Sequence, residues 1–167
     1  GKTRPYANYS IGKGFIYFAK ALPYETEQKF LECNENIRLH LRIWSIPQDK
    51  YHHYLERFWW EIQDYLDDIE AIVLFGSVAK GSAEEGSDID LLIFVNKDIK
   101  KYEEKFNAYS IGKKGEEELI MAKIFTKNDF LNSLKKGSKF AEEIIKKSLI
   151  IYDKDRVFEE IKNEFNK

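Results

Sequence analysis

The sequence predicts an α/β or α+β sheet domain from about residue 48 onward, preceded by an N-terminal hairpin and helix. Two observations predict this class. Helix-type and strand-type hydrophobic patterns alternate along the second part of the chain. A turn rich in glycine and serine also separates two apolar runs, and the second run begins with two aspartates one residue apart. We expect two parts, 1–46 and 47–167, because 167 residues suffice for one domain with an appendage.

The amino-acid composition limits the classes of protein to which this chain can belong. The formal net charge is −2, so the overall charge does not call for a nucleic-acid partner. A single cysteine, Cys33, excludes an internal disulfide framework, and no apolar run approaches the roughly 18 residues that a membrane span needs. The N-terminus lacks the pattern of a signal peptide. We therefore expect an intracellular, cytoplasmic protein.

The N-terminal part predicts a hairpin followed by a helix. Residues 5–24 place aromatic and apolar side chains around Gly12 and Gly14, which is typical of a β-hairpin with a glycine turn. From 25 to 44, apolar residues recur at steps of three and four, which indicates an amphipathic helix. These residues are Phe30, Cys33, Ile37, Leu41 and Trp44.

The second part alternates helices and strands. Ser45 and Gln48 have the spacing of a capping box, and a long apolar face follows, so we expect a helix over 47–67. The pentapeptide YSIGK occurs at 9–13 and at 109–113, and we interpret both copies as turns. The remaining patterns predict strands at 71–75, 89–95, 118–125 and 149–152, and helices at 127–136, at 139–147 and from about 155.

Asp88 and Asp90 point to the same side of their predicted strand, because side chains two residues apart share a face. Two neighbouring carboxylates repel each other and raise each other's pKa unless a cation lies between them. Oxygen ligands of this kind select Mg²⁺ or Mn²⁺, and Mg²⁺ usually completes its shell with water and substrate phosphates. The pair therefore predicts a metal and a phosphate-bearing substrate.

Gly76 and Ser77 follow the preceding strand and offer backbone amides and a hydroxyl to an anion. The segment GSVAKGS is not a Walker A loop, because lysine, glycine and serine stand in the wrong order. Taken separately, a glycine-serine turn and an Asp-x-Asp at a strand start are also common in solvated turns. Their occurrence together, in this order and between two strands, favours a triphosphate site.

Gly76-Ser77, ten intervening residues and Asp88-Ile89-Asp90 resemble the signature of the DNA polymerase β-like nucleotidyltransferase superfamily, specifically its minimal nucleotidyltransferase domains. The resemblance extends from about 65 to 153, including the stretches IFTKNDF and KKSLIIYD. It implies an α+β fold, a small mixed sheet flanked by helices, and two divalent metals. It also implies transfer of a nucleoside monophosphate from a nucleoside triphosphate, such as ATP, to a hydroxyl, with release of pyrophosphate.

The resemblance implies a role for several residues. Asp88 and Asp90 would bind the metals, Gly76 and Ser77 would hold the triphosphate, and Ser87 would orient the turn. Lys80 stands where the family often has arginine, and it either pairs with a phosphate or is a solvated charge.

The family also has a third carboxylate on a neighbouring strand. Here the strand reads EEELIMAKIF, with Leu119 or Met121 where a looser alignment would look. We expect Glu118 to supply the carboxylate, because it is in phase with Ile120, Ala122 and Ile124. The alternative is that Glu116, Glu117 and Glu118 form a solvated approach to the strand.

The acceptor of the nucleotide has to come from a partner or lie at the surface, because the domain is short. Minimal nucleotidyltransferases often pair with a helical HEPN-type protein, in some cases as antitoxins that adenylylate a tyrosine of the toxin. Residues 1–24 also resemble the wing of a winged-helix domain, and Lys2 and Arg4 could contact DNA phosphates. The alternative function is therefore a non-catalytic DNA-binding or antitoxin-like regulatory scaffold. The helix over 25–44 also makes a homodimer a reasonable expectation.

Overall fold

The computed structural model describes residues 15–22, 25–32 and 35–165. The chain divides into two compact units, Gly1–Arg38 and Leu39–Lys167. The first unit contains a two-stranded antiparallel hairpin, β1 (Phe15–Leu22) and β2 (Glu25–Glu32). The predicted glycine turn at Gly12 and Gly14 lies outside the described residues.

The prediction of one helix over 25–44 is wrong for its first part. Residues 25–32 form strand β2, and helix α1 (Glu35–Trp44) begins only at Glu35. In the segment ETEQKFLE the only large apolar residues are Phe30 and Leu31, so this part carries no helical stripe of its own. It pairs instead along its whole length with β1, whose sequence FIYFAKAL is rich in strand-forming residues.

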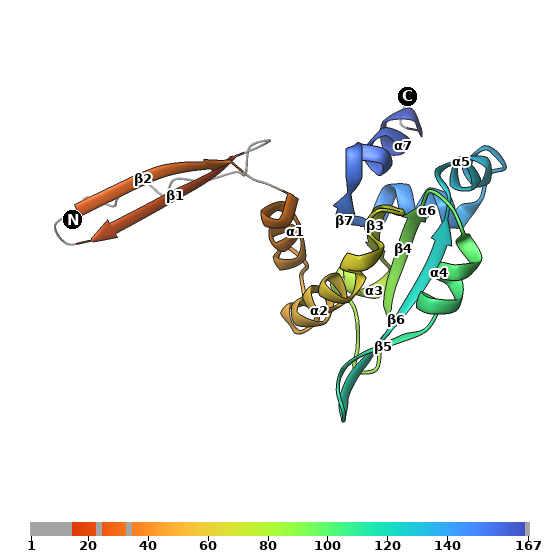
Figure 1. Cartoon of the computed structure of the whole chain (residues 1–167), viewed down its shortest axis with the longest axis horizontal. Coiled ribbons are helices and arrows are strands. Elements are labelled where there is room, and N and C mark those ends of the chain that lie inside the picture. Colours follow the sequence, from red (N-terminus) through yellow and green to blue (C-terminus); the bar gives the residue numbers. More distant parts are fainter. Residues whose placement is uncertain (1–14, 23–24, 33–34, 166–167) are drawn as a thin grey trace. The chain divides into compact units, whose positions relative to one another are not determined.

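The second unit is built on a five-stranded mixed sheet (Figure 1). The strand order is β5-β6-β4-β3-β7, in which β4 and β6 are parallel and the other neighbours are antiparallel. The second unit is thus an α+β domain with a mixed sheet, as expected from the resemblance. Its strands are β3 (Ile69–Phe75), β4 (Ile89–Val95), β5 (Tyr109–Lys113), β6 (Glu116–Phe125) and β7 (Leu149–Asp153).

Helices cover both faces of this sheet (Figure 1). On one face, Phe58 and Phe106 pack with Ile89 and Leu91 in the larger core cluster. On the other face, Phe130, Ile144 and Phe158 pack with Val73, Leu92 and Phe94. Because the core clusters lie on both sides of β3 and β4, these strands are held rigidly at the centre of the sheet. The first face is covered by α2 (His52–Ile62) and α4 (Ile99–Phe106), and the second by α5 (Lys127–Lys135), α6 (Lys139–Lys147) and α7 (Val157–Phe165).

The helix predicted over 47–67 is formed by three consecutive helical segments. They are the 3₁₀ turn η1 (Asp49–Tyr51), helix α2 and the 3₁₀ turn η2 (Gln63–Tyr65). The predicted capping box is absent from this start. The Ser45 hydroxyl donates instead to the carbonyl oxygen of Arg42 at 2.7 Å, and the Gln48 side chain makes no cap bond. The side-chain amide of Gln48 forms hydrogen bonds with the backbone of Ala83 instead.

Three elements were not predicted: strand β5, helix α4 and the short helix α3 (Gly76–Lys80), which begins at the predicted glycine-serine turn. The second copy of YSIGK, interpreted as a turn, is strand β5 and pairs antiparallel with β6. Helix α4 was not predicted, because its segment IKKYEEKF is largely charged and buries only Tyr102 and Phe106. A further 3₁₀ turn, η3 (Lys154–Arg156), leads into α7. Within the described residues, every helix is too short or too polar to cross a membrane.

Candidate active site

Gly76 brings the end of β3 into direct contact with Asp90. Phe75, the last residue of β3, is paired with Asp90 of β4, and Gly76 opens the short helix α3 (Gly76–Lys80) with a φ of +73°. A β-carbon added at Gly76 would overlap Oδ2 of Asp90 and lie 3.0 Å from its Cγ. Only glycine therefore fits here, because it tolerates both the left-handed conformation and the close approach of the carboxylate.

The two aspartates stand close enough for the charge of one to act on the other. Asp88 is exposed and Asp90 is half-buried, at the point where β4 begins. Burial, and after it the charge of Asp88, raises the pKa of the Asp90 carboxyl, whereas Lys123 and Lys80 oppose this rise. A cation placed against the pair would remove this strain by stabilising both ionised carboxylates.

The turn that carries Asp88 is held by backbone and side-chain bonds. The Ser87 hydroxyl accepts a hydrogen bond from the backbone N–H of Glu84 at 2.9 Å, and the Ser87 N–H donates to the Glu84 carbonyl at 3.1 Å. The Gln48 amide both donates to the carbonyl of Ala83 at 2.8 Å and accepts from its N–H at 3.1 Å. The Gln48 bonds tie the turn to the segment before η1, and the Ser87 bonds close the turn on itself.

Lys80 points from α3 toward α6. Its Nζ lies 2.8 Å from Oε1 of Glu143, and this hydrogen bond lowers the pKa of the Glu143 carboxyl. The pair borders a small pocket of about 160 Å³. Gly76, which lies against Asp90, also lines this pocket, together with Phe75, Lys80, Phe140, Glu143, Ile144 and Lys147.

The structure does not bring Glu118 to the aspartates. In the parallel register of β4 and β6, Ile89 pairs with Ile120 and Asp90 with Met121. Glu118 is in phase with Ile120 and therefore lies on the opposite face of the sheet from Asp90. There it approaches Tyr54, whose pKa is raised by burial and next by the charge of Glu118. The expectation that Glu118 completes the site does not fit this register.

Lys123 lies on the site face of β6 instead. It pairs with Leu92, two residues beyond Asp90 on the same side of β4. Its ammonium stands 5.3 Å from the centre of the Phe140 ring. Lys123 and Phe140 also line a pocket of about 740 Å³ between β6, α4, α5 and α6. Phe140 borders both pockets, so it separates the Lys80 side of the site from the Lys123 side.

The donor set fits one divalent ion. Asp88 and Asp90 offer carboxylate oxygens, the ligands that Mg²⁺ and Mn²⁺ prefer, beside a glycine that leaves room for substrate. Within the part of the chain that the structure describes, no three His, Cys, Asp or Glu side chains gather to hold a metal ion. The described residues therefore do not provide the three carboxylates that would accompany the two metals implied by the resemblance.

Comparison with protein families matches residues 61–157 to the family described as Polymerase beta, Nucleotidyltransferase. This match covers more than half of the chain. The chain belongs to this family. A comparison with curated proteins gives no match.

The matched segment of this nucleotidyltransferase domain contains all five strands of the sheet and both aspartates. Gln48, which holds the turn before Asp88, lies outside it. Sequence reasoning missed Gln48, Lys123 and Glu143 as residues around the nucleotidyltransferase site. Only Lys123 had a detectable signal, because it is in phase with Met121 on the strand where the third carboxylate was sought.

Proposed function

We propose that this domain transfers a nucleoside monophosphate from a nucleoside triphosphate, with ATP the first to test, to a hydroxyl of a partner molecule in the cytoplasm. The observation that carries the proposal is the contact between Gly76 and Asp90, whose carboxylate also feels the charge of Asp88. It combines two carboxylates in need of a cation with a backbone that a bulkier residue would block. This combination suits a divalent ion bound together with a triphosphate.

The residues have distinct roles in this proposal. Asp88 and Asp90 hold Mg²⁺ or Mn²⁺, which when bound neutralises the carboxylates and the phosphate oxygens. Gly76 and Ser77 lie against the triphosphate, and Lys80 exchanges its Glu143 partner for a phosphate oxygen. Ser87 and Gln48 keep the turn in place. Catalysis then depends mainly on positioning and on charge stabilisation.

The reaction forms one bond and breaks another at the α-phosphorus. The acceptor oxygen bonds to this phosphorus, the bond to the bridging oxygen breaks, and pyrophosphate leaves with the electron pair. The proton of the acceptor hydroxyl passes to water. We propose a protein or nucleic-acid hydroxyl as the acceptor, and a tyrosine of a HEPN-type partner is the specific case in which the chain acts as an antitoxin.

Transfer of label tests the proposal. The protein is incubated with α-³²P-labelled nucleoside triphosphates, Mg²⁺ or Mn²⁺ and lysate of its native cell, and label is followed on protein and RNA. We expect metal-dependent labelling that Asp88→Asn with Asp90→Asn abolishes. The control, Asp64→Asn with Asp67→Asn, removes the same charge from two exposed positions and should keep it. Labelling that survives loss of the Asp88–Asp90 pair would refute the assignment.

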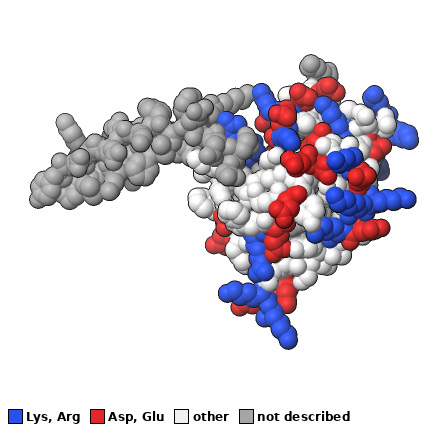
Figure 2. Space-filling model, in the orientation of Figure 1, with Lys and Arg blue, Asp and Glu red and all other residues white. Residues whose placement is uncertain are grey.

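A regulatory scaffold without catalysis is the second candidate. The observation that favours it is the presence of Met121 and Lys123 on the face of β6 where a carboxylate was expected. The N-terminal residues Lys2 and Arg4, which were expected to contact DNA, lie outside the described residues. On the face of the second unit in Figure 2, basic and acidic side chains are interspersed. Tight, salt-sensitive DNA binding without metal-dependent triphosphate binding would support the scaffold.

A further inference from the structure

The strand beside Asp90 presents a cation where a third carboxylate was expected. On the site face, β6 places Met121 directly opposite Asp90 and Lys123 opposite Leu92. Two carboxylates carry the charge that one divalent ion neutralises. A second divalent ion at this site would lack a protein carboxylate of its own, and a lysine ammonium nearby would repel it.

Lys123 is placed to act on a bound substrate. Its side chain is exposed and lines the larger pocket, and it makes no ion pair with another described residue. Lys80, by contrast, is paired with Glu143.

We propose that the domain binds one divalent ion with its triphosphate, and that the Lys123 ammonium provides the positive charge that a second ion would bring to the β6 side. This inference rests on the proposed function. The ammonium belongs to the chain itself, so its presence at the site does not depend on metal concentration. Its flexible stem allows the ammonium to leave the Phe140 ring for a phosphate oxygen.

The number of bound ions tests the first half of the proposal. The whole chain is titrated with Mn²⁺ in the presence of α,β-methylene-ATP or of inorganic triphosphate, and free Mn²⁺ is followed by electron paramagnetic resonance. We expect one protein-bound Mn²⁺ per chain. Two bound ions overturn the inference while leaving the proposed function intact. Failure of both probes to bind overturns the proposed function and the inference with it.

Met121→Asp tests the missing ligand directly. This change places a carboxylate opposite Asp90 and should raise the count from one to two Mn²⁺ per chain. Circular dichroism checks the fold. If Met121→Asp does not fold, Leu119→Asp serves in its place, because Leu119 lies on the same face and is 37% exposed. Glu118→Gln, on the opposite face, is the matched control and should leave the count unchanged. A count of one in the folded aspartate variant contradicts the inference.

Lys123→Gln tests the second half. We expect about a tenfold weaker affinity for α,β-methylene-ATP, which is the usual size of one lost charge-assisted contact, and recovery in Lys123→Arg. Lys162→Gln is a matched control, because Lys162 lies 5.7 Å from the centre of the Phe158 ring, a similar cation–π contact on α7. Equal affinity of Lys123→Gln and the wild type would show that Lys123 only covers Phe140, and would overturn this half.

Discussion

A single missing side chain allows the two halves of the site to meet. Gly76 has no β-carbon, so the backbone that follows β3 lies against the Asp90 carboxylate. The same carboxylate is partly withdrawn from water and stands beside Asp88, and both effects make its charge costly. The missing side chain of Gly76 and the charge of Asp88 thus both act on Asp90. A change at either residue should therefore alter metal binding.

Gly76→Ala should destabilise the fold more than Gly86→Ala. Both glycines have left-handed φ values, +73° and +79°, so both variants lose about 1 kcal/mol from backbone strain. At Gly76 the added methyl also overlaps Asp90, whereas at Gly86 it meets nothing within 4 Å. We expect a further loss of about 1–3 kcal/mol and weaker Mn²⁺ binding for Gly76→Ala alone. Urea denaturation and Mn²⁺ titration measure both, and equal losses in the two variants would contradict the contact.

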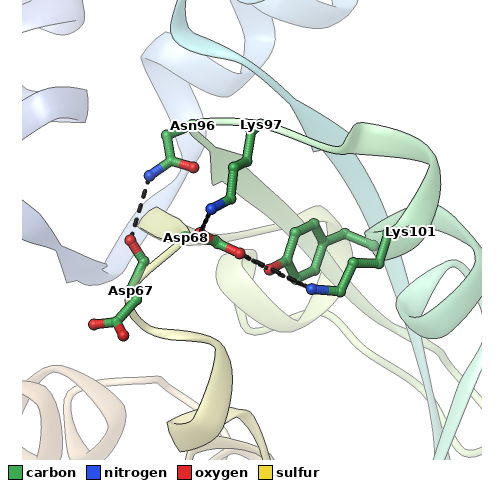
Figure 3. Close-up of polar contacts among 6 residues, drawn as sticks. Asp67, Asp68, Asn96, Lys97 and Lys101 are labelled. Atoms are coloured by element: carbon green, nitrogen blue, oxygen red, sulfur yellow. Dashed lines mark hydrogen bonds and ion pairs between the residues drawn. The ribbon is translucent and has the colours of Figure 1, made fainter.

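The two ends of β3 are anchored by different networks. At its C-terminal end lies the site, where the Gln48–Ala83 bonds hold the turn before Asp88. At its N-terminal end, Asp68 joins β3 to the segment after β4 and to α4 (Figure 3). Its carboxylate lies 2.9 Å from Lys97 Nζ and accepts a hydrogen bond from the Tyr102 hydroxyl at 2.6 Å. The rigidity of β3 and β4 at the site depends on both anchors.

Asp68→Asn should lower stability more at neutral pH than at acid pH. The hydrogen bond from Tyr102, and next the one from Lys97, lowers the pKa of Asp68 below its ordinary value of 3.8. Because the folded-state pKa is lowered, the interaction stabilises the fold above the unfolded-state pKa and is lost as the pH falls through the folded-state value. Urea denaturation at pH 7 and pH 3 should show a gap that narrows. Asp67→Asn is the control, because only the backbone oxygen of Asp67 accepts a bond from Asn96 (Figure 3). A gap that is the same at both pH values would argue against this role.

Gln48→Ala should weaken metal binding from outside the site. It removes both bonds to the backbone of Ala83, which should cost about 1–2 kcal/mol of unfolding free energy and loosen the turn before Asp88. Gln63→Ala is a control, since Gln63 makes one side-chain bond, to the carbonyl of Trp59 in its own helical segment. We expect Mn²⁺ affinity to fall in Gln48→Ala and to stay constant in Gln63→Ala. Amide hydrogen exchange at 81–88 should speed up only in the former.

The whole molecule consists of one unit with a two-sided core and one unit with a hairpin. Among the residues whose burial the structure describes, both core clusters are formed from Leu39 onward, and the candidate site draws on β3, α3, β4, β6 and α6 of the same unit. The second unit therefore contains everything that the proposed chemistry uses. Trp44 and Trp60 are its most exposed large aromatic residues among those that the structure describes, at 59% and 66% exposure.

A fragment of residues 35–167 should fold and bind metal without the hairpin. It keeps all of α1, whose Leu39 and Ile43 are buried in the larger cluster. We expect its free energy of unfolding to lie within about 1 kcal/mol of the full chain, because the described core is intact. Tryptophan fluorescence in urea reports on this, since Trp44, Trp59 and Trp60 all remain. An unfolded fragment would show that the hairpin contributes to the core.

Local patterns predicted elements that depend on local forces. The strand at 89–95 and the helix at 139–147 were predicted with the bounds that the structure has, because their apolar spacing is strong and continuous. Strand β2 and the second YSIGK were misinterpreted. Their strand character comes from pairing with β1 and β6, and a partner strand leaves little trace in the segment itself.

The sequence by itself predicted the glycine-serine turn, the strand that follows it and the face of that strand on which Asp90 lies. Alternation along one strand is local geometry and needs no partner. Only the tertiary structure decided which residues of β6 share the face of Asp90. The parallel register of β4 and β6 places Met121 and Lys123 on the site face and Glu118 on the other. That register is set by packing between segments some thirty residues apart, such as Ile89 and Ile120, which no local pattern encodes.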